Sequence, residues 1–130
     1  MPRTASRHPT ELELEILNIL WRSGGATARE VQTALRPTRQ LATTSVITVL
    51  NIMARKGYLT RQKRGGSFRF EPSITEQATA RGMLGDLVRR VFRGSRASAL
   101  LGLLEEGDLD QQELELLRKL VEQKTAKPRK

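Results

Sequence analysis

A hydroxyl-rich stretch near the start of one predicted helix carries side chains suited to contact with a nucleic acid. Thr44, Ser45 and Thr48 are small and uncharged, and they lie mostly off the apolar stripe of that helix. Hydroxyl groups donate or accept hydrogen bonds at base edges, and a threonine methyl group can touch a thymine methyl in the major groove. The pattern predicts base contacts by these three residues. The alternative is a weak helix start whose polar side chains only face solvent.

Basic side chains follow in a predicted β-hairpin. Residues 58–64 and 67–71 read as two strands joined by Gly65-Gly66, a pair that supplies the positive φ angles of a tight turn. The basic side chains of this ribbon are Arg61, Lys63, Arg64 and Arg69. A finger of this kind lies along a phosphate backbone, so the ribbon predicts phosphate contacts by Arg61, Lys63 and Arg64. Arg39, in the loop before the hydroxyl-rich helix, is predicted to make another.

The overall charge favours an anionic partner. The 130 residues hold 23 basic and 14 acidic side chains, a net charge of +9, and residues 1–72 carry +7 of it. Nucleic acid is the first candidate for such an excess. There is no cysteine and a single histidine, which excludes disulfides, thiolate nucleophiles and cysteine-ligated metals. We therefore expect no enzyme, no cofactor and no metal site.

Three helices must position these side chains. Capping signatures at residues 10–13 and 27–30 begin the first two, which end at Gly24 and Pro37. The third covers residues 42–55, where apolar side chains recur at i, i+3, i+4 and i+7. Three helices followed by a two-stranded ribbon is the order of a winged helix-turn-helix. The fold class expected is therefore mainly α with a small β-hairpin.

The remainder of the chain predicts a helical pairing segment. Residues 73–124 read as three amphipathic helices, the first with a capping signature at Ser73, the second over residues 96–106 and the third starting at Asp110. Their apolar faces are hard to bury within one chain, which favours a homodimer, although packing back onto the basic module is the alternative. The predicted dimer contacts are Leu84, Leu87, Val91, Leu100, Leu104, Leu114, Leu117, Leu120 and Val121.

The predicted organisation has four parts. Residues 1–9 form a flexible arm, residues 10–72 a winged-helix domain, residues 73–124 a three-helix dimerisation segment, and residues 125–130 a basic, disordered tail. The chain shows no apolar run long enough for a membrane span and no signal segment at its start. We expect a cytoplasmic protein that does not insert into a membrane.

Four stretches of the chain resemble the penicillinase-repressor family of bacterial transcription regulators, the BlaI/MecI/CopY group. They are residues 10–17 with Trp21, residues 43–50, residues 55–59 and residues 65–72. The resemblance extends to about Lys124 and thus covers nearly the whole chain. It implies a dimeric winged-helix repressor that binds palindromic operators in double-stranded DNA. By position, the base contacts of the family fall on Thr44, Ser45 and Thr48, with Thr43, Lys63 and Arg64 near phosphates.

The resemblance also implies how such repressors are released. Copper-responsive members end in a cysteine cluster that this chain lacks, so copper sensing is not supported. Other members are cut by a membrane metalloprotease sensor at an Asn-Phe bond, and the matching positions here are Gly102 and Leu103. That sensor is a candidate partner, and Gly102-Leu103 is the candidate cleavage region.

Two other function classes fit parts of the pattern. A non-specific architectural DNA-binding protein would share the positive charge but not discriminate between sequences, and a helical interaction adaptor would have no salt-dependent DNA affinity. A metal site at Asp108, Asp110 and Glu113 is weaker, because acidic residues at a helix start ordinarily serve the cap and the dipole.

Overall fold

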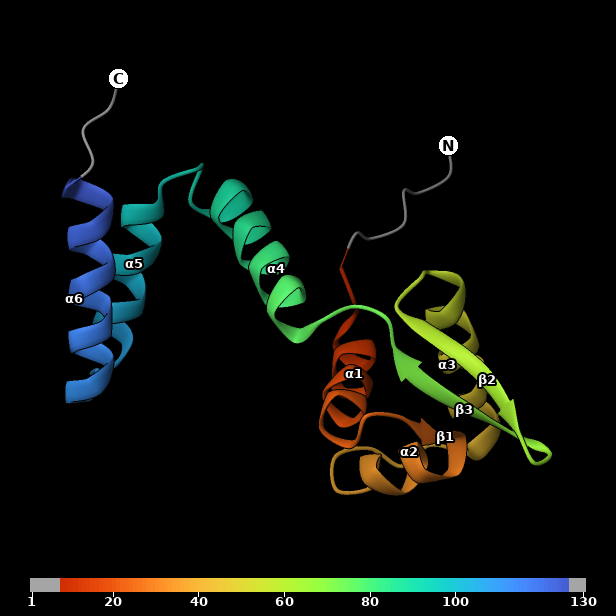
Figure 1. Ribbon diagram of the computed structural model, residues 1–130. Coiled ribbons are helices and arrows are strands. Elements are labelled where there is room, and N and C mark those ends of the chain that lie inside the picture. Colours follow the sequence, from red (N-terminus) through yellow and green to blue (C-terminus); the bar gives the residue numbers. More distant parts are fainter. Residues whose placement is uncertain (1–7, 127–130) are drawn as a thin grey trace, which may run out of the picture. The chain divides into compact units, whose positions relative to one another are not determined.

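The computed structural model describes residues 8–126 (Figure 1). The chain divides into two compact units, with the boundary after Leu84. The first unit contains helices α1 (Glu11–Ser23), α2 (Ala28–Leu35) and α3 (Thr43–Arg55) and strands β1 (Ala26–Thr27), β2 (Leu59–Arg64) and β3 (Ser67–Pro72). Helix α4 (Glu76–Val91) contains the boundary, and α5 (Arg96–Glu106) and α6 (Gln111–Ala126) lie in the second unit. The predicted fold class, mainly α with a small β-hairpin, is confirmed.

Helices α1 and α2 begin with the predicted capping boxes. The Thr10 hydroxyl accepts from the Glu13 N–H at 3.2 Å, and the Glu13 carboxylate accepts from the Thr10 N–H at 2.9 Å. Thr27 and Glu30 make the same pair of bonds at the same distances. These reciprocal bonds satisfy N–H groups that have no partner inside a helix, which fixes where each helix starts.

The sheet has three strands, not the two that the sequence predicts. The order is β1-β3-β2, and the short strand β1 pairs antiparallel with β3 through Ala26↔Phe70 and Thr27↔Arg69. A two-residue strand carries no periodicity that a sequence could show. Gly25 permits the approach, because its φ is +152° and an added Cβ would lie 2.8 Å from the Glu71 Cγ.

One hydrophobic core joins the three helices and the sheet of the first unit. Its largest fully buried side chains are Ile16, Leu17, Leu20, Val31, Leu35, Val46, Leu50 and Met53. Phe70 and Leu59 bring the sheet into the same cluster. The core therefore fixes α3 and the hairpin relative to each other.

A buried carboxylate ties the start of α1 to the end of α3. Glu13 is only 4% exposed, and its Oε2 accepts from the Lys56 Nζ at 2.8 Å. The same ammonium group lies 5.7 Å from the centroid of the Tyr58 ring. Burial raises the pKa of the Tyr58 hydroxyl. Glu13 thus serves both the α1 cap and the position of α3.

Helix α4 starts later than predicted, and its first half belongs to the first unit. Ser73 does not cap it, because the Ser73 hydroxyl donates to the Gly57 carbonyl at 2.6 Å. The cap is Thr75, whose hydroxyl accepts from the Ala78 N–H at 3.1 Å. The Trp21 indole N–H donates to the Ile74 carbonyl at 2.9 Å and holds this segment against α1. The folded unit therefore continues past the predicted boundary at residue 72.

The predicted ends of the chain are only partly covered by the described residues. Pro9 is buried, so the predicted flexible arm is already packed at its last residue, and α6 continues two residues into the predicted tail. The arm over residues 1–7 and the tail over residues 127–130 lie outside the described residues. Within residues 8–126, every helix is too short or too polar to span a bilayer.

We expect Glu13→Ala to lower the free energy of unfolding by about 2–3 kcal/mol, because it removes a cap and leaves a partly buried lysine without its anion. Chemical denaturation followed by circular dichroism measures the loss. The matched control is Glu30→Ala, which breaks the same type of capping box at an exposed site and should cost about 1 kcal/mol. Equal losses for the two variants would contradict the role of the Glu13–Lys56 pair.

Candidate nucleic-acid interface

Helix α3 has one buried stripe and one exposed stripe. Val46, Leu50 and Met53 are fully buried, which fixes the rotation of the helix about its axis. With 3.6 residues per turn, Thr44 and Thr48 lie on the opposite side, and both are exposed. Ser45, also exposed, lies at the edge of the same surface. The structure therefore brings together the three residues predicted to contact bases.

The hydroxyl groups of this helix differ in what they can still bind. The Thr48 hydroxyl donates to the Thr44 carbonyl at 3.0 Å, so it presents its lone pairs and its methyl group outward. The Thr43 hydroxyl donates to the Gln32 side-chain carbonyl at 2.8 Å, which ties α3 to α2. Thr48 is therefore arranged as a hydrogen-bond acceptor and an apolar contact.

The N-terminus of α3 is open to an anion. Its N-cap residue, Ala42, makes no side-chain capping bond, and the first turn carries no acidic residue. The other helices of residues 8–126 all have a side-chain cap, from Thr10, Thr27, Thr75, Ser95 and Asp110. Unsatisfied N–H groups and the helix dipole together favour a phosphate at such an end.

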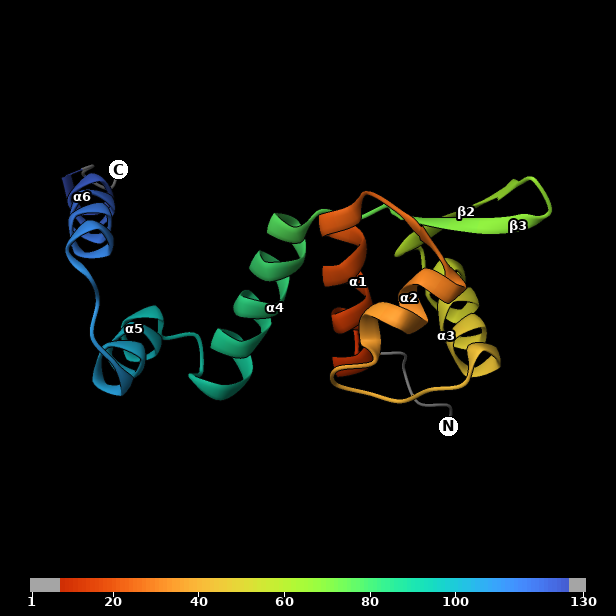
Figure 2. The same ribbon diagram turned by 90° about the horizontal axis from the view of Figure 1, so that it is seen from below.

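The β2–β3 hairpin, called the wing below, projects beyond the helices, as Figure 2 shows. Its strand pairs alternate between two faces. Arg61 pairs with Phe70 and Lys63 with Phe68 on the face directed at α3, whereas Arg64 pairs with Ser67 on the other face. The predicted phosphate contacts Lys63 and Arg64 therefore point to opposite sides of the wing.

Arg61 links the wing to α3. Its Nη1 donates to the Asn51 Oδ1 at 2.8 Å, and its guanidinium carbon lies 4.4 Å from the centroid of the Phe68 ring. Strand alternation places Phe68 on the same face as the buried Phe70, but the Phe68 side chain is 41% exposed. The difference arises because the wing extends past the helices that cover Phe70.

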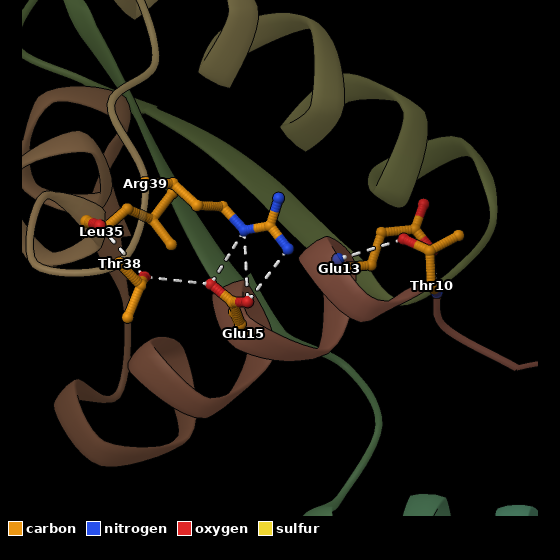
Figure 3. Close-up of polar contacts among 6 residues, drawn as sticks. All are labelled: Thr10, Glu13, Glu15, Leu35, Thr38 and Arg39. Carbon is orange, nitrogen blue, oxygen red and sulfur yellow. Dashed lines mark hydrogen bonds and ion pairs between the residues drawn. The ribbon is translucent and has the colours of Figure 1, made fainter.

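Arg39 is held by a carboxylate of the same unit (Figure 3). Its Nε donates to both oxygens of Glu15 at 3.1 and 3.2 Å, and the Thr38 hydroxyl donates to the Glu15 Oε1 at 3.2 Å. The bond from Arg39 holds the pKa of the Glu15 carboxyl below its ordinary value, and the pKa of the guanidinium is raised in turn. This arrangement favours a role for Arg39 in fixing the α2–α3 loop over contact with phosphate.

Three residues that the sequence reasoning did not assign to the site lie beside it. Arg55 is exposed seven residues after Thr48, so it continues the exposed stripe of α3. Asn51 is the partner of Arg61, and Arg29 stands exposed in the first turn of α2. Helical spacing from Thr48 was the signal for Arg55, whereas no local pattern places Arg29 near α3.

The second unit exposes most of its large apolar side chains. Of the nine residues predicted to form the dimer contact, Leu84 is the last residue of the first unit and the other eight lie in the second. All nine are exposed except Leu117, which is half-buried. Helices α5 and α6 share a groove of about 300 Å³, and its leucines are Leu100, Leu103, Leu104, Leu109, Leu116, Leu117 and Leu120. Contiguous exposed apolar side chains of this kind are typical of an interaction site.

The other candidate positions of this part are helical. Gly102 and Leu103 lie in the middle of α5. Asp110 accepts from the Glu113 N–H at 2.8 Å and its own N–H donates to the Glu113 carboxylate, so the two residues form the capping box of α6. In the described part of the chain, no three acidic or histidine side chains are grouped as a metal site.

Three helices, a wing and an exposed α3 stripe define the class of winged helix-turn-helix proteins. The model of the penicillinase repressor family matches residues 9–123, nearly the full length. The chain therefore belongs to the penicillinase repressor family.

Two relatives illustrate the similarity. The methicillin resistance regulatory protein MecI of Mammaliicoccus sciuri is 25% identical over 112 residues, which cover 86% of this chain and 91% of the relative. The transcriptional regulator BlaI of Mycobacterium tuberculosis is 32% identical over 103 residues, which cover 78% of this chain and 75% of the relative. Among solved structures, the DNA-binding domain of the repressor BlaI matches 52% of this chain and 82% of that domain, with 28% identity and a TM-score of 0.47.

The two faces of the wing predict unequal effects on DNA affinity. We expect Lys63→Gln to weaken binding to any duplex and to reduce the log–log salt slope by about 0.9, the value for one phosphate contact. Arg64→Gln, on the other face, removes the same charge and serves as the matched control with a smaller change in slope. Fluorescence anisotropy at several salt concentrations measures both. A larger slope change for Arg64→Gln would overturn this assignment.

Proposed function

We propose that this protein is a sequence-specific transcriptional repressor that binds a palindromic DNA operator as a homodimer. The observation that carries the proposal is the exposed hydroxyl stripe of α3, which lies beside a basic wing in a chain of the penicillinase repressor family. Its relatives include the proteins named MecI and BlaI described above. Because the proposed partner is double-stranded DNA, we propose a cytoplasmic location for the protein.

The base contacts proposed are those of Thr44, Ser45 and Thr48. Their side chains are short, so α3 can enter a major groove about 12 Å wide without steric conflict. Thr48, with its hydroxyl proton used inside the helix, would accept from a base amino group or touch a thymine methyl. Arg55, at the end of the same stripe, would reach a phosphate or a guanine edge.

Phosphate contacts are proposed on both sides of this stripe. The uncapped start of α3, with Thr43, would bind one phosphate through its N–H groups. Arg61 and Lys63 on the α3-facing side of the wing would bind the backbone across the adjacent groove. Arg64 would add a weaker contact from the other face. We give Arg39 a structural role, because Glu15 holds it.

A homodimer is proposed through the second unit. One winged helix covers a short half-site, and two copies are needed to cover a palindrome with half-sites about one helical turn apart. The exposed leucines of α5 and α6 would supply the apolar surface for a two-fold contact.

Release by a membrane metalloprotease sensor is the proposed route of induction. Gly102 and Leu103 are exposed, although they are helical and a protease needs an extended substrate. A glycine within a helix lowers local stability by about 1 kcal/mol relative to alanine, which assists unwinding at this bond. Cutting α5 would remove the dimer contact and with it the affinity for the palindrome.

Variants of Thr48 test the base contacts. We expect Thr48→Val, which keeps the shape and loses the acceptor, to reduce the preference for the operator over random duplex by about 1–3 kcal/mol. The starting preference should be about 10³ or more, which distinguishes a repressor from an architectural protein. Competition binding with an operator mapped by footprinting gives both values.

The matched control is Thr60→Val, the same change at an exposed position of β2 whose side chain lies on the face away from α3. It should leave the preference unchanged. If Thr48→Val and Thr60→Val behave alike, α3 does not read the operator through Thr48.

A charge in the apolar surface tests the dimer. Val121 is 46% exposed, so an aspartate there should not disturb a single copy. If Val121 is buried between two copies, Val121→Asp should shift the protein to monomer in sedimentation equilibrium and lower operator affinity at least tenfold, since a charge buried without a partner is costly. Gln112→Asp adds the same charge at a polar position of α6 and should leave the mass unchanged. An unchanged dimer mass for Val121→Asp would contradict the interface.

A further inference from the structure

A groove lies between α2, α3 and the wing of the first unit. Its volume is about 580 Å³, and it is lined by the first turn of α2, one side of α3 and the α3-facing side of the wing. Small-molecule sites of proteins have volumes of about 300–1,000 Å³. The proposed base contacts Thr44, Ser45 and Thr48 are not among its lining residues, so the groove lies beside the hydroxyl stripe and not on it.

The interior of the groove is apolar. Ile47 is 39% exposed and Phe68 is 41% exposed, and they are the two large apolar side chains of residues 8–72 that are this accessible. Both line the groove, and the buried Phe70 closes its floor. Flat rings and a branched aliphatic side chain favour a flat apolar ligand.

The rim of the groove is cationic and has no carboxylate. Arg29 and Arg61 line it, and none of the other lining residues is acidic. Within residues 8–126, the partners of the Arg61 guanidinium are both neutral: the Asn51 amide and the Phe68 ring. Arg29 makes no ion pair with any residue of the described range 8–126. Guanidinium groups bind carboxylates in a planar, bidentate manner, so the charge of the site complements a carboxylate.

We infer that this groove binds a small aryl carboxylate, with its ring against Ile47 and Phe68 and its carboxylate at Arg29 and Arg61. The effect of this ligand on DNA binding rests on the proposed function. Thr43 and Arg61 line the groove and are also proposed phosphate contacts, so the ligand and the operator would compete for the same surface. The protein would then respond to an aromatic acid directly, without being cut.

The test uses 2-naphthoate and the full-length protein without DNA, followed by isothermal titration calorimetry and amide chemical shifts. We expect saturable binding with a Kd of about 1 mM or tighter, the range for a ligand of this size. The neutral isostere 2-naphthamide should bind at least fivefold more weakly. The shifts should centre on α3 and the wing.

Matched arginine variants separate the groove from the general charge of the protein. Arg29→Gln should weaken 2-naphthoate binding about fivefold to tenfold. Arg36→Gln removes the same charge just after the other end of α2, outside the groove, and should change the Kd by less than about twofold. Phe68→Ser should weaken binding similarly to Arg29→Gln, and circular dichroism verifies that each variant is folded.

Operator binding gives the second readout. At ten times its Kd, 2-naphthoate should weaken operator binding about tenfold at matched ionic strength, as simple competition requires. Binding without competition would overturn the regulatory consequence. Absence of saturation, equal binding of the amide, or equal effects of Arg29→Gln and Arg36→Gln would overturn the site itself. A protein that binds 2-naphthoate and no DNA would instead refute the proposed function.

Discussion

The interface depends on the burial of one stripe of α3. Val46, Leu50 and Met53 lie in the core with the side chains of α1, α2 and the sheet, and this packing leaves the helix a single rotation about its axis. Because side chains of a helix repeat every 3.6 residues, the stripe opposite faces outward, and its residues Thr44, Thr48 and Arg55 are exposed. A helix that exposes hydroxyls to a groove must be rigid, since base contacts tolerate little displacement. The core therefore determines which residues of α3 can meet DNA.

Much of this fold can be predicted from local sequence patterns. The capping boxes at Thr10 and Thr27, the apolar period of α3 and the Gly65-Gly66 turn are interactions within a few residues, and each was predictable. The third strand was not, because β1 exists only through its pairing with β3. Ser73 has the residue type and spacing of a helix cap, but its hydroxyl donates to the carbonyl of Gly57, just after α3, and does not cap α4. Tertiary contacts override local preference at such positions.

The same division holds at the interface. The hydroxyl stripe follows from helical spacing, and strand alternation could have separated Lys63 from Arg64. Arg39 looks like any exposed basic residue in the sequence, and only the structure brings Glu15, 24 positions earlier, within 3.1 Å of its guanidinium. The groove beside α3 likewise joins Arg29 to Phe68 across 39 positions of sequence. Sites built from distant segments leave no local signal.

The positions of the carboxylates explain why the positive charge of this arginine-rich chain is concentrated on one surface of the first unit. Glu15 holds Arg39, Glu13 holds Lys56, and Glu71 lies 3.7 Å from Arg69. These pairs neutralise cations that support loops and helix ends. Within residues 8–84, the basic side chains Arg61 and Lys63, on the side of the wing directed at α3, form no ion pair with a carboxylate. The first turn of α3 also carries no acidic residue. Positive potential is thus left where α3 and the wing meet, and an anion in that place, whether a phosphate or a carboxylate, restores the balance.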